Sequence, residues 1–311
     1  ADAIAERNTL DRDWTRNAIG AAREIPQIQK LVMPVPNRGN KKNWAAYRTR
    51  FVEPVRIRAG VQFWDAHAAD LQRAQETYGV PAEIIVGILG METLYGQHTG
   101  KIRVMDALTT LAVDFPSAHP RAESRREYFV LELEQYLKEM HRTGADPMKP
   151  RGSYSGDMGL PQFMPSSWTR FGVDFDGNGG VDLWSAADAI GSVANYLKQH
   201  GWIAGLAVYY VVSPALAPDV LDAALSPGLA PDRRVEQLGS DLIVLSAGQS
   251  MPAPETPIAL VALENLELPK TYVAATGNLR VITRYNPSRY YAMAVTDLGG
   301  AVADARAATA R

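Results

Sequence analysis

Cysteine is absent from the 311-residue chain, which excludes disulfides, thiolate metal sites and a cysteine nucleophile. The chain also lacks any run of about eighteen uninterrupted apolar residues, the length that a membrane-spanning helix needs. Its N-terminus has no basic region followed by an apolar core. We therefore expect the chain as given to be soluble. An export signal or a lipid-bearing cysteine removed from a precursor would leave no trace in it.

A strong charge of either sign is missing as well. The 32 Lys and Arg residues nearly balance the 34 Asp and Glu residues, so the formal net charge is −2 and we expect no nucleic-acid partner. Hydrophobic residues at 46% and charged residues at 21% are typical of a soluble globular protein. Because 311 residues exceed the usual size of a single core, we expect two or three domains.

Apolar spacing and proline positions divide the chain into four parts. Helical periodicity dominates the first half, whereas short apolar runs between prolines indicate a β-rich module later. The predicted class is mainly α (α+β). The expected parts are a helical domain over 1–78, punctuated by Pro34, Pro36 and Gly39, a helix-rich core over 79–202, a small β-rich domain with linkers over 203–278, and a return segment to the core with a C-terminal helix over 279–311.

Several individual elements can be predicted within these parts. Helical spacing favours helices over 121–140, 186–200 and 290–305. Polar and apolar residues alternate over 279–285, which is typical of a strand. We therefore expect a strand that leads into the closing helix.

Glu92 lies in an apolar helical run over 83–95, with Ile88, Leu89 and Tyr95 at i−4, i−3 and i+3. These spacings place its carboxylate on an apolar stripe. Burial disfavours the charged form, so such a glutamate should have a raised pKa and could donate a proton near neutral pH, as a general acid must. The other interpretation is a glutamate at a helix end whose carboxylate reaches solvent.

An acidic loop begins at Asp174. It carries acidic or amide residues at positions 1, 3 and 5 and Gly179 at position 6, which is the opening of an EF-hand calcium loop. Position 12 is Ser185 where that loop supplies a glutamate, so a lengthened loop closed by a later aspartate is expected. A plain surface turn is the alternative. The expected ligands are Asp174, Asp176, Asn178, the carbonyl of Gly180, and Asp188.

The run over 152–168 is rich in glycine, serine and amide side chains. Small residues permit close backbone approach, and hydroxyl and amide groups match the donors and acceptors of a sugar. The run therefore predicts a carbohydrate site. It is equally compatible with a turn-rich connector that leads into a helix at Ser166.

These motifs occur together, in the order seen in one family. The matching segments are 91–93, 152–168, 173–179, 188–196 and 282–286. Over residues 10–305 the chain resembles the lytic murein transglycosylase B family of bacterial cell-wall enzymes.

The resemblance implies a lysozyme-like core with the substrate groove, an all-helical domain and a small inserted β-domain. It implies a peptidoglycan lytic transglycosylase that cleaves the β-1,4 bond between N-acetylmuramic acid and N-acetylglucosamine and forms 1,6-anhydromuramic acid. It also implies structural Ca²⁺ in an EF-hand-like loop and no organic cofactor. The expected partners are glycan strands and cell-wall synthesis or remodelling proteins. The implied protein is a periplasmic monomer, whose precursor could carry an outer-membrane lipid anchor.

The resemblance also implies roles for individual residues. Glu92 matches the catalytic glutamate, and the calcium ligands match the loop residues given above. The substrate-binding residues would be Ser153, Gln162, Phe163, Arg125, Arg126, Tyr196, Tyr285 and Tyr291. The chain departs from the family pattern just before the arginine pair, at 117–123, so the resemblance does not say which arginine faces substrate.

The chemistry needs only one carboxylate. Glycosidases usually use two, but the motifs around Glu92 offer no clear second acid except Asp157. A single glutamate could protonate the leaving oxygen and then accept the proton of the sugar's own C6 hydroxyl as that hydroxyl attacks C1. A hydrolytic muramidase and a non-catalytic peptidoglycan-binding module are the alternatives.

Overall fold

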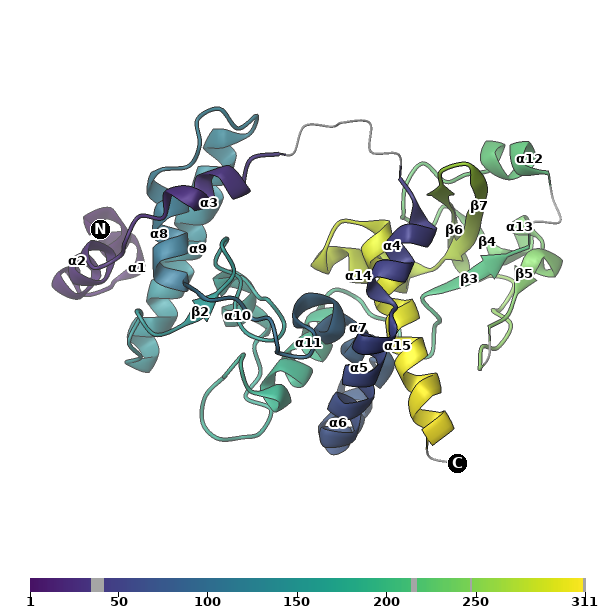
Figure 1. The fold of residues 1–311 in the computed structure, drawn as a ribbon, viewed down its shortest axis with the longest axis horizontal. Helices are drawn as coiled ribbons and strands as arrows, with labels where there is room; N and C mark the ends of the chain where they lie inside the picture. Colours follow the sequence, from purple (N-terminus) through teal and green to yellow (C-terminus); the bar gives the residue numbers. More distant parts are fainter. Residues whose placement is uncertain (35–41, 214–216, 247, 310–311) are drawn as a thin grey trace. The chain divides into compact units, whose positions relative to one another are not determined.

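The structure is a computed structural model that describes residues 1–34, 42–213, 217–246 and 248–309. Pro36 and Gly39, two of the predicted helix-breaking positions, lie outside the described residues. The chain forms two compact units (Figure 1). The first combines Ala1–Asn37 with Glu92–Ser192, and the second combines Arg38–Met91 with Val193–Arg311. The four-part domain division stays a prediction.

The first unit is mostly helical. A typical start is that of α2, where the Asp11 carboxylate accepts the Trp14 N–H and satisfies a free donor of the first turn. The elements that lie wholly in this unit are α1 (Asp2–Asn8), α2 (Arg12–Gly20), α3 (Pro26–Leu31), β1 (Ile102–Arg103), α8 (Val104–Val113), α9 (Ala122–Thr143), β2 (Arg151–Gly152) and α10 (Pro165–Phe171).

Helices α8 and α9 form the core of the first unit and lie side by side (Figure 1). Both bury long apolar stripes, with Leu108 and Leu111 on α8 and Leu133 and Leu137 on α9 each at most 2% exposed. Helical spacing of three and four residues places these side chains on one face. The short antiparallel pair β1–β2 lies at the start of α8 and joins it to the glycine-rich run.

The second unit combines helices with a small sheet. Two long helices run through the unit boundary: α7 (Ala82–Thr93) and α11 (Ala186–Gln199). Its other elements are α4 (Trp44–Phe51), α5 (Pro54–Ala66), α6 (Ala68–Tyr78), β3 (Tyr209–Val212), α12 (Pro218–Ala223), β4 (Arg233–Arg234), α13 (Val235–Leu238), the short 3₁₀ helix η1 (Ser240–Leu242), β5 (Ile243–Val244), β6 (Pro257–Asn265), β7 (Leu268–Ala275), α14 (Gly277–Tyr285) and α15 (Arg289–Thr309).

The sheet has the strand order β4-β6-β7-β3-β5, and every pair is antiparallel. Its centre is the β6–β7 hairpin, whose register runs from Ala259 opposite Ala275 to Asn265 opposite Leu268. Alternate residues of β6, including Ile258, Leu260 and Ala262, pack into one apolar cluster of the sheet. The predicted β-rich content of 203–278 is therefore present.

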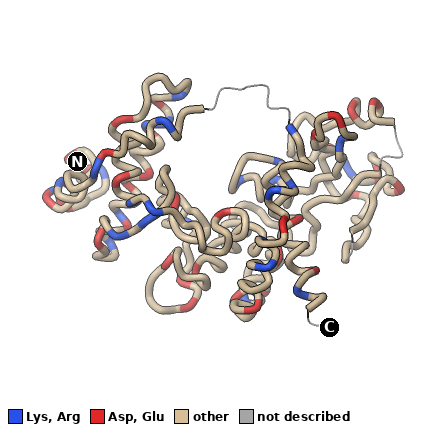
Figure 2. The backbone as a smooth tube through the Cα atoms, in the orientation of Figure 1, with Lys and Arg blue, Asp and Glu red and all other residues tan. Residues whose placement is uncertain are grey.

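The mainly α class with a small β portion is confirmed. The helices predicted over 121–140, 186–200 and 290–305 correspond to α9, α11 and α15. No helix among the described residues is long and apolar enough to cross a membrane. Residues of both charge signs occur in each unit, in keeping with the small net charge (Figure 2).

The strand predicted over 279–285 is wrong, because these residues form helix α14. Thr276 caps this helix by accepting the Asn278 N–H at 3.1 Å, and Leu279 and Ile282 are buried one helical turn apart. Val281 and Tyr285 fit both the alternation of a strand and the i, i+4 spacing of one helix face. A segment of only seven residues with this pattern does not distinguish the two structures. Thr276, three residues before Leu279, is the N-cap residue in the sequence that indicates a helix.

Helices α7 and α15 pack with almost no space between their backbones. A methyl group on Gly87 would lie 2.2 Å from the Val295 carbonyl oxygen, and one on Gly299 would lie 2.0 Å from the Glu83 carbonyl oxygen. Both distances are far below van der Waals contact, so only glycine allows this approach. The crossing fixes α7, the helix that carries Glu92 near its end.

Gly299→Ala should lower the free energy of unfolding by roughly 1–3 kcal/mol, because the added methyl must push two helix backbones apart. The neighbouring Gly300 is the matched control, since nothing lies within 4 Å of a methyl group built there. Gly300→Ala should stabilise by up to about 1 kcal/mol through helix propensity. Urea unfolding of both variants measures the two effects. Equal effects of the two substitutions would contradict the close packing.

Candidate functional site

Glu92 is the penultimate residue of α7 and is half-buried. Ile88 and Leu89, its neighbours one turn earlier, are 0% exposed. The helix ends one residue after Glu92, so Tyr95 does not continue the helical stripe as the sequence suggested. Both interpretations of Glu92 therefore hold in part. The residue belongs to an apolar helix, and its carboxylate lies at the end of that helix.

The turn after Glu92 has an unusual backbone. Leu94 and Tyr95 adopt φ values of 50° and 58°, the left-handed region that costs energy for residues other than glycine. Thr93 fixes this turn: its hydroxyl accepts the Gly96 N–H at 3.0 Å and donates to the Leu160 carbonyl at 3.0 Å. Such strain is concentrated at functional sites when the surrounding contacts enforce it.

The glycine-rich run folds back on itself beside this turn. Met158 bridges to Gly152 on one side and to Phe163 on the other. Gly159 has a φ of 68°, and a methyl group there would lie 2.2 Å from the Leu183 carbonyl oxygen. Glycine is therefore required where this run passes the acidic loop segment.

Gln162 is held by its own side chain. Its φ is 52°, and its amide nitrogen donates to the Thr99 carbonyl at 3.2 Å and to the Gly159 carbonyl at 2.9 Å. An amide has two N–H donors and one carbonyl acceptor. Both donors are used here, so the side-chain carbonyl oxygen is the group that can accept a hydrogen bond from a ligand hydroxyl.

Ser153, Ser155 and Asp157 form a hydrogen-bonded turn. The Ser153 and Ser155 hydroxyls both donate to the Asp157 carboxylate, at 2.5 and 2.6 Å. The Ser153 oxygen also accepts the N–H groups of Ser155 and Asp157, each at 3.1 Å. Ser153 therefore donates its only hydroxyl proton within the protein, and Asp157 sets the direction of that hydroxyl.

Glu132 is a buried acid that connects α9 to α10. Its carboxylate accepts the Ser166 N–H at 2.8 Å and the Ser166 hydroxyl at 2.7 Å, which satisfies a free donor in the first turn of α10. Burial raises the pKa of Glu132, against the lowering effect of the hydrogen bonds from Ser166 and Tyr128. Burial also raises the pKa of Tyr128, and the charges of Glu132 and Asp157 add to that shift.

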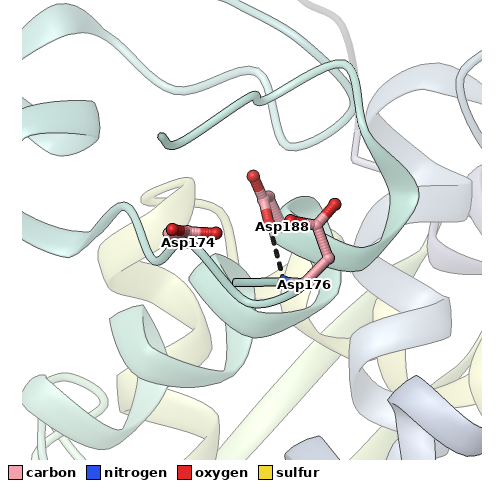
Figure 3. A group of neighbouring side chains, drawn as sticks. All are labelled: Asp174, Asp176 and Asp188. Atoms are coloured by element: carbon pink, nitrogen blue, oxygen red, sulfur yellow. Dashed lines mark hydrogen bonds between the residues drawn. The ribbon is translucent and has the colours of Figure 1, made fainter. Parts of the chain in front are cut away.

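The acidic loop brings three carboxylates together. Ligand oxygens of Asp174, Asp176 and Asp188 all lie within 4.8 Å of one another (Figure 3). Asp188 comes from the first turn of α11 and is 0% exposed. It accepts the N–H groups of Phe175 at 2.7 Å and Asp182 at 2.8 Å, so it ties both ends of the loop to the helix.

The remaining loop residues support these acids. The Asn178 N–H donates to both Asp174 and Asp176, at 3.0 and 3.1 Å. The Asn178 side-chain oxygen accepts the Gly180 N–H at 3.3 Å. Three carboxylates at this separation repel one another, and a hard cation with oxygen ligands would remove that repulsion. The donor set therefore suits Ca²⁺.

Other residues predicted to bind substrate differ in exposure. Arg125 is half-buried and lies 5.1 Å from the ring centres of both Tyr128 and Phe129, whereas Arg126 is exposed. Phe163 is only 2% exposed. In the described structure, Phe163 belongs to the core and the arginines to the surface of α9.

The three predicted tyrosines belong to the second unit. The Tyr196 hydroxyl donates to the Arg284 carbonyl at 2.7 Å, and its ring meets that of Tyr285 edge-on at 4.9 Å. Burial raises the pKa of Tyr196 to about 12, so the hydroxyl keeps its proton and stays a donor. Tyr291 is 4% exposed. A shared groove of these tyrosines with Glu92 stays a prediction.

Sequence reasoning missed Glu132. The residue has Phe129 at i−3 and Tyr136 at i+4, the same kind of apolar neighbourhood that drew attention to Glu92. A search for glutamates with apolar neighbours at helical spacing would have identified Glu132 as well as Glu92. The serine partners of Asp157 had no sequence signal, because only the fold of the turn brings them onto one carboxylate oxygen.

Comparisons with known proteins bear on this arrangement. A family model described as the transglycosylase SLT domain matches residues 1–300. The chain is 38% identical to the membrane-bound lytic murein transglycosylase B of Escherichia coli K12 over 98% of this chain and 82% of that protein. The structure of the E. coli lytic transglycosylase Slt35 in complex with calcium has a TM-score of 0.83, with 37% identity over 98% of this chain and 92% of that one. SltB3 of Pseudomonas aeruginosa in complex with NAG-anhNAM-pentapeptide has a TM-score of 0.77, with 28% identity over 96% and 77%.

These likenesses assign the fold to the mainly α, lysozyme-like class, as the family resemblance implied. The family model spans nearly the whole chain, and a relative above one-third identity is covered over most of its length. The chain belongs to the transglycosylase SLT domain family, among its lytic murein transglycosylases of type B.

Glu132 should make the stability of the protein depend on pH. Because its pKa is raised in the folded state, the folded protein holds this proton more tightly than the unfolded chain does. Its contribution is therefore fully present below the unfolded pKa and is lost as pH rises through the folded pKa. The free energy of unfolding of wild type relative to Glu132→Gln should fall as pH rises above about 4.3, the usual glutamate pKa of the unfolded chain. Urea unfolding at several pH values measures it.

Glu127→Gln is the control, because Glu127 is exposed on the same helix. Its effect on stability should change little over this pH range. A wild-type advantage over Glu132→Gln that grows with pH would mean that the charged carboxylate is the stabilised form, and would contradict the raised pKa.

Proposed function

We propose that this protein is a peptidoglycan lytic transglycosylase. It cleaves the β-1,4 bond between N-acetylmuramic acid and N-acetylglucosamine and leaves a 1,6-anhydromuramic acid end. The position of Glu92 carries the proposal: a half-buried carboxyl group at a helix end, in a family of transglycosylases, beside a turn that is hydrogen-bonded to the glycine-rich run. The NAG-anhNAM-pentapeptide bound by SltB3 has the chemistry of the expected product.

Glu92 acts twice in the proposed reaction. It first donates its proton to the glycosidic oxygen as positive charge develops at C1. The resulting carboxylate then accepts the proton of the C6 hydroxyl while that oxygen bonds to C1. The nucleophile belongs to the same sugar, so its effective concentration is high and it outruns water. No second carboxylate is required.

The first unit supplies groups that can orient the sugar. Gln162 offers its carbonyl oxygen, because both of its N–H donors are held by the backbone. Ser153 donates to Asp157 and accepts two backbone N–H groups, so its proposed role is to fix the shape of the sugar-binding surface. Arg125, Arg126, Tyr196, Tyr285 and Tyr291 are the further proposed contacts. Phe163 is 2% exposed and is proposed to support the glycine-rich run from the core. A preset hydrogen-bonding surface of this kind lowers the entropy lost when a glycan strand binds.

The acidic loop is proposed to bind Ca²⁺ as a structural ion, with Asp174, Asp176, Asn178, the Gly180 carbonyl and Asp188 as ligands. The support is the convergence of three carboxylates and the calcium complex of Slt35. The ion would tie the loop to α11 and take no part in the chemistry. The periplasm, where murein lies, is the proposed location, and a monomer acting on glycan strands is the proposed state.

Glu92→Gln should lower murein turnover by roughly 10²–10⁴-fold, near the upper end because one residue serves both proton transfers. Glycan binding and the unfolding temperature should stay close to wild type, since the amide has nearly the same shape. Release of muropeptides from purified murein measures turnover. Near-normal turnover by Glu92→Gln would contradict the assignment.

Asp157→Asn separates this mechanism from one with two carboxylates. If Asp157 only holds Ser153 and Ser155, an amide oxygen still accepts one of their hydroxyls and the loss should stay below about 10-fold. A hydrolase that uses Asp157 as its base would lose activity as severely as Glu92→Gln does. Parallel turnover assays of the two variants distinguish these outcomes.

Calcium removal should lower the unfolding temperature by on the order of 5 °C, because the ion binds the folded state alone. Asp176→Asn should lose most of this response to calcium. Asp182→Asn is the control, since Asp182 lies in the same loop but outside the carboxylate cluster. Activity well below the unfolding temperature should fall less than stability does. Loss of activity in chelator with an unchanged unfolding temperature would make the ion catalytic and contradict its structural role.

A further inference from the structure

A cavity of about 740 Å³ lies within the second unit. It is bounded by the start of α4, the loop after α12, strand β6 and the start of α15. None of its lining residues belongs to the site proposed above. Its volume falls in the range of roughly 300–1,000 Å³ that is usual for small-ligand sites.

The lining carries positive charge without a counter-ion. Lys42 and Arg289 contribute cations, and no aspartate or glutamate lines the cavity. Among the described residues neither cation forms an ion pair. Arg289 donates from Nη1 to the Ala262 carbonyl at 3.2 Å, which holds the guanidinium in place and leaves its other donors for a ligand. A carboxylate is the group that this fork of donors matches best.

Strand β6 presents a free backbone position to the same cavity. On the edge of β6 that faces away from β7, the N–H and C=O of Leu260 are hydrogen-bonded to Ser226. The N–H and C=O of Glu264 on the same edge are hydrogen-bonded to the Tyr290 hydroxyl. Ala262 lies between them in the same register, so its N–H and C=O also point away from β7. Its carbonyl is bound by Arg289, and its N–H faces the cavity, where an extended peptide could accept it.

The remaining walls are apolar. Leu225, Pro227, Leu229 and Pro287 line the cavity together with the ring of Tyr47. An inorganic anion would leave this surface uncovered, whereas a short peptide with small side chains would cover it. The combination of two cations, one strand-edge N–H and apolar walls therefore favours a peptide end over a free anion.

We propose that this cavity binds the C-terminal carboxylate of a short extended peptide. The carboxylate lies between Arg289 and Lys42, and the peptide backbone accepts the Ala262 N–H. That the peptide is the stem peptide of a murein strand rests on the proposed function. Binding of the peptide itself does not depend on cleavage.

Titration of the whole 311-residue chain with a fluorescent synthetic stem pentapeptide tests this proposal. The free-acid peptide should bind, and its C-terminal amide should bind roughly 10-fold more weakly or worse, because a charged hydrogen-bonded pair is lost. Arg289→Gln should weaken the free acid to a similar extent and leave the amide almost unchanged. Arg280→Gln, an exposed arginine on α14, is the charge-matched control and should bind like wild type.

Lys42→Gln and Leu229→Glu provide the test if Arg289→Gln does not fold. Both should weaken the free acid, the second by placing a like charge in the cavity. The proposal is overturned if the acid and the amide bind equally, if no peptide binds, or if inorganic phosphate displaces the peptide at equal concentration. The titration involves no cleavage, so a failure to bind peptide would not affect the test of catalysis with Glu92→Gln. Likewise, a failure of the transglycosylase assignment would not affect the measured peptide binding.

Discussion

The hydrogen bond from Thr93 to the Leu160 carbonyl is the contact on which the site depends. It joins the end of α7 to the glycine-rich run, two segments that are far apart in the sequence. The same threonine holds the turn in which Leu94 and Tyr95 adopt left-handed conformations. Without this contact the helix could continue past Glu92, and the carboxyl group would no longer stand at a helix end beside a polar loop.

The acids of the first unit differ in what holds them, and this decides what each can do. Glu132 is engaged by the first turn of α10, Asp157 by two hydroxyls, and Asp188 by backbone N–H groups of the acidic loop. Each of these carboxylates fixes local structure. Glu92 is the one that the family resemblance assigns to chemistry. Internal attack by the sugar, as proposed above, needs only one catalytic carboxylate, and the proposal gives that role to Glu92.

The sequence was most informative where spacing alone carries meaning. The long helices α9, α11 and α15 follow from a sustained period of 3.6, and the acidic loop follows from acids at alternate positions. The predicted element was wrong where a short segment fits the period of a strand as well as that of a helix, as at α14. The sequence could not reveal the backbone bonds that orient Gln162, nor the cavity beside β6, because both are made by contacts between distant segments. Roles in substrate binding still rest on the family resemblance.

Digestion of purified murein in water enriched in ¹⁸O, followed by mass spectrometry of the muropeptides, tests the central claim most directly. Internal attack by the C6 hydroxyl incorporates no solvent oxygen and gives products one water lighter than those of hydrolysis. The account predicts anhydro ends without heavy oxygen, and roughly 10²–10⁴-fold slower formation of these products with Glu92→Gln. Reducing ends that carry ¹⁸O would show that water is the nucleophile and would contradict the single-carboxylate mechanism.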